Sequence, residues 1–346
     1  MSAIRRAEVL SVDGEGGRAS LRILDGPLAG EACPGVFYPE FGGAPEAGDA
    51  VLANTVGVEM RLGTGGAAFI LPGAGGGAPE NRNHFVKLPY TPLQFPATPG
   101  EIAESLVGAP VAVLPLHSHL AVACAAAAKL RPGCRVAFVW NGGGALPVAF
   151  SRSVAELKEK GLLHLVVSSG NCIGGDVEAV NEYSGLLSAA GAGLILAGIG
   201  PGVVGTGSPY GHGGMSAASS LNAATSLGAE PILAPRISFA DGRERHRGIS
   251  HHTRSILEAA LARCRVAFPE GASGSIPLEG LPERHEYIPV GFGAAGLEEA
   301  SGLTFESMGR TYTDDEHFFD SAAAAVWLAL GGEAGDESEG STGGSG

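Results

Sequence analysis

The stretch that decides the fold is VAVLPLHSHLAVACAAAAKL (111–130), in which a short uninterrupted apolar run leads directly into a helical segment. The same alternation continues along the chain. The later apolar runs are RVAFVW (135–140), LLHLVVS (162–168), GLILAGI (193–199), PILAPRI (231–237) and CRVAFP (264–269). Runs of this kind are typical of buried parallel strands, and the segments between them have the length of crossover helices. Residues 110–330 are therefore predicted to form an α/β domain with a doubly wound, mostly parallel, Rossmann-like sheet.

The N-terminal part has a different pattern, in which short strand-like runs alternate with Gly, Pro and Asp. These runs are RAEVLSV (6–12), RASLRIL (18–24), GDAVLANTV (48–56) and AAFILP (67–72). We expect a small β-rich barrel or sandwich over residues 1–71. Residues 72–109 are rich in Pro and Gly and are predicted to be a connection, and the acidic Gly/Ser-rich tail (331–346) is predicted to be disordered.

Composition excludes several classes of protein. With 346 residues, 45% of them hydrophobic, the chain can bury a large core. A net charge of −14 and the lack of a basic run argue against a nucleic-acid partner. No signal-peptide core or membrane-length apolar run occurs, and five scattered cysteines without a CxxC pair favour a reducing compartment. We expect a cytoplasmic protein without a membrane partner, and we leave a homo-oligomer open.

Polar residues and glycines follow five successive predicted strands. Because parallel strands deliver their following loops to one carboxyl edge, these residues are expected to line one cleft there. The convergence predicted is that of His117, Asn141, Asp176, Gly205 and His246.

The segment SFADGRERHRGISHHT (238–253) carries the densest set of chemically useful side chains. Histidines exchange protons near neutral pH and bind metals, and arginines hold carboxylates or phosphates. The alternative is a salt-bridged loop in which Ser250 caps the next helix. Because His251 and His252 are adjacent, one is expected to enter the cleft and the other to support it from outside. The candidate catalytic residues are His246, His251, His252, Asp176 and His117.

The segment GPGVVGTGSPYGHGG (200–214) allows backbone N–H groups to hold a phosphate at the start of a helix near Gly214. It matches neither dinucleotide nor P-loop signatures, so a purely structural glycine turn stays open. The candidate substrate-binding residues, from this and the neighbouring loops, are Arg236, Arg247, Asn141, Gly142, Gly143, Gly175, Gly202, Gly205, Thr206 and Gly207.

A divalent metal ion is a further open question. Asp176 is expected to begin a helix, where it is an N-cap or a ligand. Carboxylate and imidazole groups suit Zn, Mn or Fe, although the spacing matches no established zinc signature. The candidate ligands are Asp176, His246 and His252.

Five segments together resemble an uncharacterised bacterial family, DUF3866. They are KLPYTPLQ (87–94), NGGGALP (141–147), GGDVEAVN (174–181), the glycine segment 200–214, and RISFADGRERHRGISHHT (236–253). The resemblance extends over nearly the whole chain except the tail, and it implies a bacterial origin but no catalytic roles. The sequence departs from similar ones at Asn141, where an acidic residue is expected.

The residues themselves favour a small-molecule enzyme, a hydrolase or group transferase, that acts on an anionic substrate. The alternative is a non-catalytic metabolite-binding or regulatory protein that uses the same crevice. A dinucleotide-dependent oxidoreductase is disfavoured, because no strand–GxGxxG–helix unit with a following ribose-binding acid occurs.

Overall fold

The structure is a computed structural model that describes residues 3–13, 17–41, 43–60, 66–73, 85–89, 91, 93–97, 99–274 and 276–332. The chain divides into two compact units, Met1–Thr98 and Pro99–Gly346, each of which we describe by itself. Residues 333–346 of the tail predicted to be disordered lie outside the described residues.

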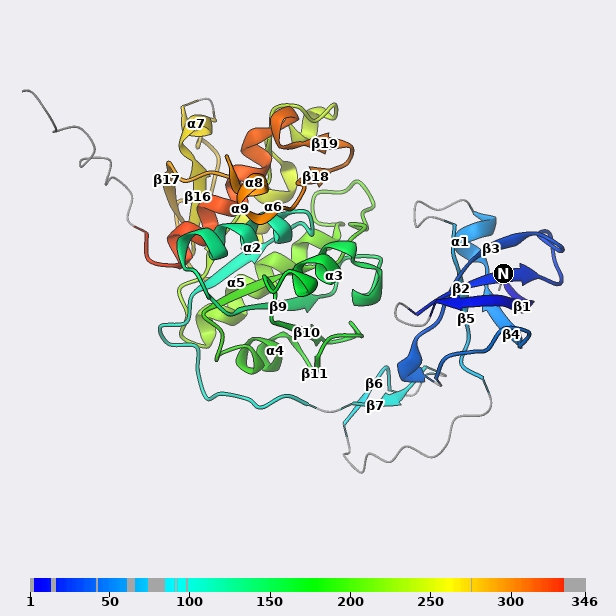
Figure 1. Cartoon of the computed structure of the whole chain (residues 1–346). Coiled ribbons are helices and arrows are strands. Elements are labelled where there is room, and N and C mark those ends of the chain that lie inside the picture. The colour runs from blue at the N-terminus through cyan, green and yellow to red at the C-terminus, as the bar shows by residue number, and fades with distance from the viewer. Residues whose placement is uncertain are drawn as a thin grey trace, which may run out of the picture. The chain divides into compact units, whose positions relative to one another are not determined.

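The first unit contains a closed barrel with the strand order β1-β2-β3-β5-β4 (Figure 1). Its strands are β1 (Ile4–Asp13), β2 (Arg18–Ile23), β3 (Ala32–Val36), β4 (Ala50–Asn54) and β5 (Ala68–Ile70), with the short helix α1 (Val56–Glu59) after β4. Alternate apolar residues such as Val9, Leu21 and Ile23 fill the barrel interior. The predicted β-rich region at the N-terminus is therefore confirmed.

Strand β3 was not predicted, because Pro34 and Gly35 both argue against a strand. The structure gives the reason for the glycine. A Cβ atom at Gly35 would lie 2.6 Å from Cγ of Leu21, so the strand passes too close to the core for any larger residue. A second short pairing, β6 (Val86–Lys87) with β7 (Phe95–Pro96), lies within the segment predicted to be an irregular connection.

The second unit is built on an eight-stranded sheet with the order β11-β10-β9-β12-β8-β13-β16-β17, and every neighbouring pair is parallel. The predicted α/β class with a large parallel sheet is thus confirmed. The strands are β8 (Val111–Leu114), β9 (Val136–Asn141), β10 (Leu165–Ser169), β11 (Val177–Ala179), β12 (Leu194–Ile199), β13 (Ile232–Leu233), β16 (Arg265–Pro269) and β17 (Glu286–Val290).

Helices cover both faces of this sheet (Figure 1). One face packs against α2 (His119–Leu130), α3 (Arg152–Glu159), α8 (Leu297–Ser301) and α9 (Glu316–Ala329). The other packs against α4 (Glu182–Ser188), α5 (Ser216–Ser226), α6 (His251–Ala259) and α7 (Glu270–Ser273). Successive strand residues face opposite layers, which explains why the strands are apolar on both sides.

Two small hairpins carry segments to the carboxyl edge of the sheet. The first pairs β14 (Ile237–Ser238) with β15 (Gly248–Ile249), and its loop includes a 3-10 turn, η4 (Glu244–His246). The second pairs β18 (Glu306–Ser307) with β19 (Arg310–Thr311). Both bring polar side chains above the ends of the central strands.

In the part of the chain that the structure describes, every helix is too short or too polar to span a bilayer.

Candidate functional site

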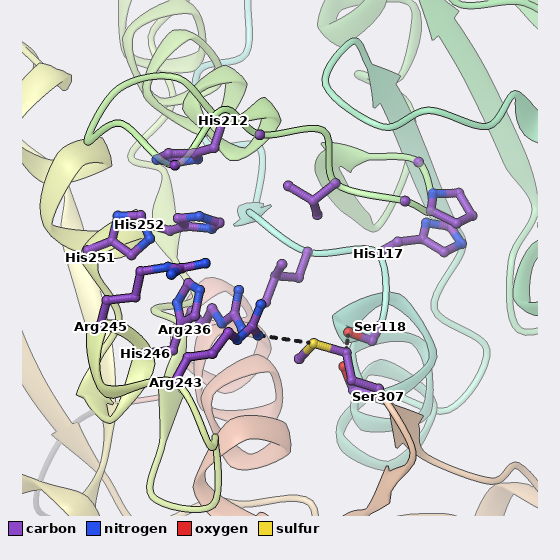
Figure 2. A pocket seen from close by; sticks show the side chains of 18 of the residues that line it. His117, Ser118, His212, Arg236, Arg243, Arg245, His246, His251, His252 and Ser307 are labelled. Carbon is purple, nitrogen blue, oxygen red and sulfur yellow. Dashed lines mark hydrogen bonds between the residues drawn. The ribbon is translucent and has the colours of Figure 1, made fainter. Parts of the chain in front are cut away.

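A pocket of about 560 Å³ opens at the carboxyl ends of three neighbouring strands, β12, β8 and β13 (Figure 2). Its walls come from the segments that follow those strands, together with the β18–β19 hairpin. A volume of this size suits a small molecule. The predicted site residues that line the pocket are His117, Gly202, Gly205, Gly207, Arg236, His246, His251 and His252.

One wall of the pocket is a cluster of four imidazole rings (Figure 2). The ring centroids of His246 and His251 lie 4.8 Å apart, and those of His246 and His252 lie 4.9 Å apart. The ring of His212 stacks on that of His252, with centroids 3.7 Å apart and planes 9° from parallel. The expectation that only one of His251 and His252 enters the cleft is wrong, because the pocket lies at the end of α6 and both rings face it.

Local hydrogen bonds hold this cluster in place. Ser250 caps α6, as predicted, because its hydroxyl accepts a hydrogen bond from the backbone N–H of His252 at 3.2 Å. The same hydroxyl lies 2.7 Å from Nδ1 of His246. One serine thus fixes both the start of the helix and the ring of His246, whose Nε2 is left for another partner.

The surroundings keep these imidazoles uncharged. Burial lowers the pKa of His246 to about 3 and the pKa of His252 to about 2, and nearby arginines add to both effects. Burial also lowers the pKa of His251, with Arg245 as the next cause. At neutral pH the cluster therefore offers nitrogen lone pairs rather than positive charge.

Three of these residues have the arrangement of a metal site. His246, His251 and His252 each offer one nitrogen, and the three nitrogens lie within 4.8 Å of one another. Asp176, the other predicted ligand, does not belong to this group.

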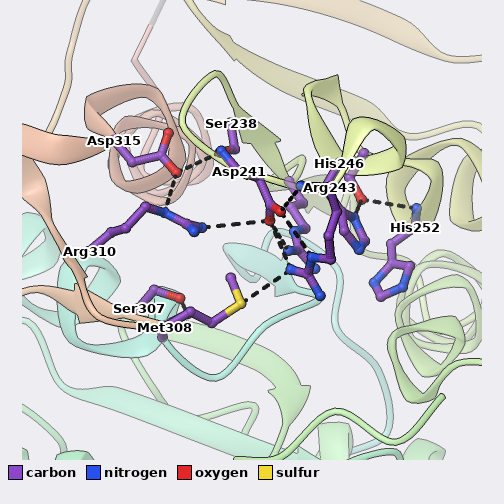
Figure 3. Close-up of polar contacts among 12 residues, drawn as sticks. Ser238, Asp241, Arg243, His246, His252, Ser307, Met308, Arg310 and Asp315 are labelled. Carbon is purple, nitrogen blue, oxygen red and sulfur yellow. Dashed lines mark hydrogen bonds and ion pairs between the residues drawn. The ribbon is translucent and has the colours of Figure 1, made fainter.

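Beside the histidines lies a buried charge network (Figure 3). The carboxylate of Asp241, which is 2% exposed, accepts hydrogen bonds from Arg236 at 3.0 Å and Arg243 at 2.8 Å. Arg310 is 3.7 Å from the same carboxylate and also pairs with Asp315 at 3.1 Å. Hydrogen bonds from Arg243 hold the pKa of Asp241 far below its usual value, so this carboxylate stays ionised.

Arg245 lies on the same loop but has a different environment. It lines the pocket, and it makes no hydrogen bond or ion pair with any residue that the structure describes. Arg247, the predicted anion-binding residue two positions later, is exposed and does not line the pocket. The free guanidinium in the pocket is therefore that of Arg245.

His117 forms the opposite wall (Figure 2). Its Nδ1 lies 3.1 Å from the carbonyl oxygen of Ile199, which can only accept, so Nδ1 carries the proton. Nε2, 2.7 Å from the Ser151 hydroxyl, is then the acceptor. Burial lowers the pKa of His117 to about 4, and the ring is neutral at pH 7.

The glycine segment lines the pocket through Gly202, Gly205 and Gly207, whereas Thr206 turns away from it. Most of its backbone donors are already used: the N–H groups of Thr206 and Gly213 bond to Gly211 and Val204. The start of α5 does not line the pocket. The segment therefore builds a wall and offers few N–H groups to a phosphate.

Gly142 and Gly143 do not line the pocket either. A Cβ atom on Gly143 would overlap the carbonyl oxygen of Gly213, and the backbone there has a φ of +127°. The glycines after β9 thus allow two backbones to touch, and they support the pocket from behind.

Asn141 ends β9 at the expected edge, but its side chain points away from the pocket. Its Nδ2 donates to Glu182 at 2.6 Å and to Ser220 at 3.1 Å, and its Oδ1 accepts from Ser169. Because this group is buried beneath α4, burial raises the pKa of Glu182 to about 7.

Asp176 was expected to begin a helix, and this expectation is wrong, because it precedes strand β11. The chain turns back after β10, so Asp176 lies near the amino end of that strand, where its carboxylate accepts from the Val166 N–H at 2.8 Å and pairs with Lys158. Gly175 packs against the backbone of Val166 in the same turn. The predicted convergence therefore holds for His117, Gly205 and His246 and fails for Asn141 and Asp176.

Sequence reasoning missed some lining residues as candidates. His212 stands in the glycine segment and reaches the cluster because that segment folds back on itself, pairing Gly205 with His212. Ser307 and Met308 come from a hairpin far along the chain: Ser307 donates to Ser118 at 3.1 Å, and Arg243 lies 3.4 Å from the Met308 sulfur. Only His212 had a signal, a histidine among conformationally special glycines.

Comparison with known proteins gives a family and no activity. A family model described as "Protein of unknown function (DUF3866)" matches residues 35–326. No curated protein and no solved structure matches the chain.

Proposed function

The chain belongs to the DUF3866 family, and we propose that it is a small-molecule enzyme, a hydrolase or group transferase, that binds an anionic substrate in this pocket. The observation that carries the proposal is the unpaired guanidinium of Arg245 beside a cluster of neutral histidines. A free cation attracts an anion, and uncharged imidazoles accept protons or bind metals.

The charge around the pocket supports an anionic ligand. Arg236, Arg243 and Arg310 share the carboxylate of Asp241, and Arg310 has Asp315 as a second partner. Arg245 adds a further positive charge. This local excess stands out in a chain whose net charge is −14, and it would draw negatively charged molecules into the cleft.

The position on the sheet supports a ligand-binding role. We interpret the sheet as doubly wound, because β8 leads into α2 on one face while β12 leads into α5 on the other. Loops that part in this way leave a crevice between neighbouring strands, and ligands of doubly wound proteins bind there. The pocket walls follow these two strands and β13.

The alternative is a metabolite-binding protein without turnover. The proton-accepting nitrogens on two facing walls favour an enzyme, since a mere binding site has no need of them. The proposal includes a location in the cytoplasm, which is supported by five cysteines that are all free.

The test compares Arg245→Gln with Arg247→Gln. Each variant removes one guanidinium from the same loop, but only the first removes a group that lines the pocket. In a series of phosphate and sulfate concentrations at fixed ionic strength, the wild type and Arg247→Gln should gain thermal stability, and Arg245→Gln should gain much less. Equal responses of the two variants would exclude anion binding in the pocket. Turnover of a panel of phosphate and carboxylate esters then separates the enzyme from the binding protein.

A further inference from the structure

We propose that His246, His251 and His252 bind a divalent transition-metal ion of the zinc type, with one coordination position open to the pocket. This inference deepens the proposed function, because the ion would lie where an anionic substrate enters (Figure 2). It rests on geometry, on unpaired buried nitrogens and on the charges nearby.

The geometry is close to that of a three-histidine site. The three candidate ligand nitrogens lie within 4.8 Å of one another. Around a tetrahedral ion with bonds of about 2 Å, ligand nitrogens are about 3.4 Å apart. Small rotations of the rings about their side-chain torsions close this difference. Three protein ligands are also the number found at catalytic zinc sites, where water or substrate takes the fourth position.

The ring nitrogens lack other partners. Nε2 of His251 and Nδ1 of His252 are buried, and neither has a hydrogen-bond partner among the residues described. Buried polar atoms nearly always have one, so two such atoms side by side call for a missing group. His246 completes the set, because the Ser250 hydroxyl holds Nδ1 and so orients Nε2. A hydrogen bond of this kind is the usual support of a metal-binding histidine.

The ligand type selects the metal. The group contains three imidazoles and no carboxylate, since Asp241 is held by its arginines. Imidazole suits Zn²⁺, Co²⁺, Ni²⁺ and Cu²⁺, whereas Mg²⁺ and Ca²⁺ require oxygen ligands. An ion bound here would activate water for hydrolysis.

The same charges predict that metal and anion bind together. Three neutral ligands leave the ion its full positive charge, and Arg236, Arg243 and Arg245 lie around the pocket. An anion in the open position relieves this repulsion. By linkage, phosphate should therefore increase the affinity for the metal, and the metal should increase the affinity for phosphate by the same factor.

The experiment uses the full chain without a histidine tag, stripped of metal with a chelator and titrated with Co²⁺. We expect one Co²⁺ ion per chain, with the visible absorption of a tetrahedral site, and tighter binding when inorganic phosphate is present. His251→Gln and His252→Gln should each weaken binding at least about tenfold. His164→Gln is the control, since it removes an imidazole outside the pocket. Circular dichroism verifies that each variant is folded, and His251, which is only partly buried, is the safer substitution.

Absence of stoichiometric Co²⁺ binding, or equal binding by wild type and both ligand variants, would overturn the metal site. These outcomes differ from failure of the proposed function. If phosphate stabilises the chelator-treated protein through Arg245 while Co²⁺ does not bind, the anion pocket stands and the metal site falls. If Co²⁺ binds but phosphate has no effect on either ligand or stability, the metal site stands without its coupling to an anion.

Discussion

The ring of His212 lies flat on the ring of His252, at a centroid distance of 3.7 Å, although 40 residues of chain (252 minus 212) separate them. The contact joins the loop after β12 to the first turn of α6. His212 is not one of the three histidines whose nitrogens converge, so it acts on the cluster through the orientation of His252.

Removing that support should weaken the cluster without unfolding the protein. We expect His212→Ala to reduce Co²⁺ affinity about tenfold, the usual order for loss of a supporting contact, and His212→Phe to keep most of it because a flat ring remains. Titrations of the two variants and the wild type check this. A loss in both variants would mean that a nitrogen of His212, rather than its stacked ring, matters.

Asp241 and Asp176 form a matched pair for stability. Both are ion-paired aspartates, but Asp241 is buried among arginines and Asp176 meets Lys158 near the surface. Asp241→Asn leaves buried positive charges uncompensated and should cost about 3 kcal/mol of unfolding free energy. Asp176→Asn should cost less than about 1 kcal/mol, because the surface pair is screened and the amide oxygen still accepts from Val166. Urea unfolding measures both, and similar losses would contradict the assignment.

Glu182 gives a pH dependence whose sign is fixed. Burial raises its pKa from 4.5 to about 7, so the folded protein keeps a proton that the unfolded chain releases. Unfolding free energy should therefore fall as pH rises from about 4.5 to 7, by up to about 3 kcal/mol, and this contribution should be constant above that range. Glu182→Gln should lack this slope and should be the more stable protein at pH 7.

The control for Glu182 is Glu159→Gln, which removes one exposed carboxylate from α3. It should follow the wild-type profile. Urea midpoints between pH 4 and 8 decide the matter, and a Glu182→Gln variant that keeps the wild-type slope would rule out this carboxyl as its source.

Gly142 and Gly143 are neighbours with opposite requirements. A Cβ atom at Gly142 meets nothing within 4 Å, whereas one at Gly143 collides with the Gly213 carbonyl in a backbone of positive φ. Gly142→Ala should leave the melting temperature within about 2 °C, and Gly143→Ala should lower the unfolding free energy by more than about 2 kcal/mol. Differential scanning calorimetry of the two variants tests this, and equal tolerance would mean that the two loops separate freely.

The sheet was predictable because its strands carry an uninterrupted apolar signal, which parallel burial on both faces produces. The barrel was predictable only in outline, since Pro34 and Gly35 hide β3. Asp176 was misplaced for a related reason: β11 is three residues long, and a strand this short within a helix-like sequence has no periodicity of its own.

The histidine cluster was predictable in part, because His246, His251 and His252 lie on one loop. Asn141 was assigned to the correct edge but not to the correct face. It shares the face of Val139, which packs beneath α4 and α5, and the sequence does not say which layer of helices a given strand face will meet. His212 joined the cluster through a pairing between distant residues, for which the sequence has no local pattern.

The three strands that carry the pocket walls are hydrogen-bonded neighbours, β12 to β8 and β8 to β13. Their spacing is set by backbone bonds common to every parallel sheet, so no wall residue is needed to hold the walls apart. Exposed wall positions such as Ser208 and Glu306 can therefore change without disturbing the frame. Homologous proteins could diverge in substrate by exchanging these side chains while inheriting an unaltered scaffold.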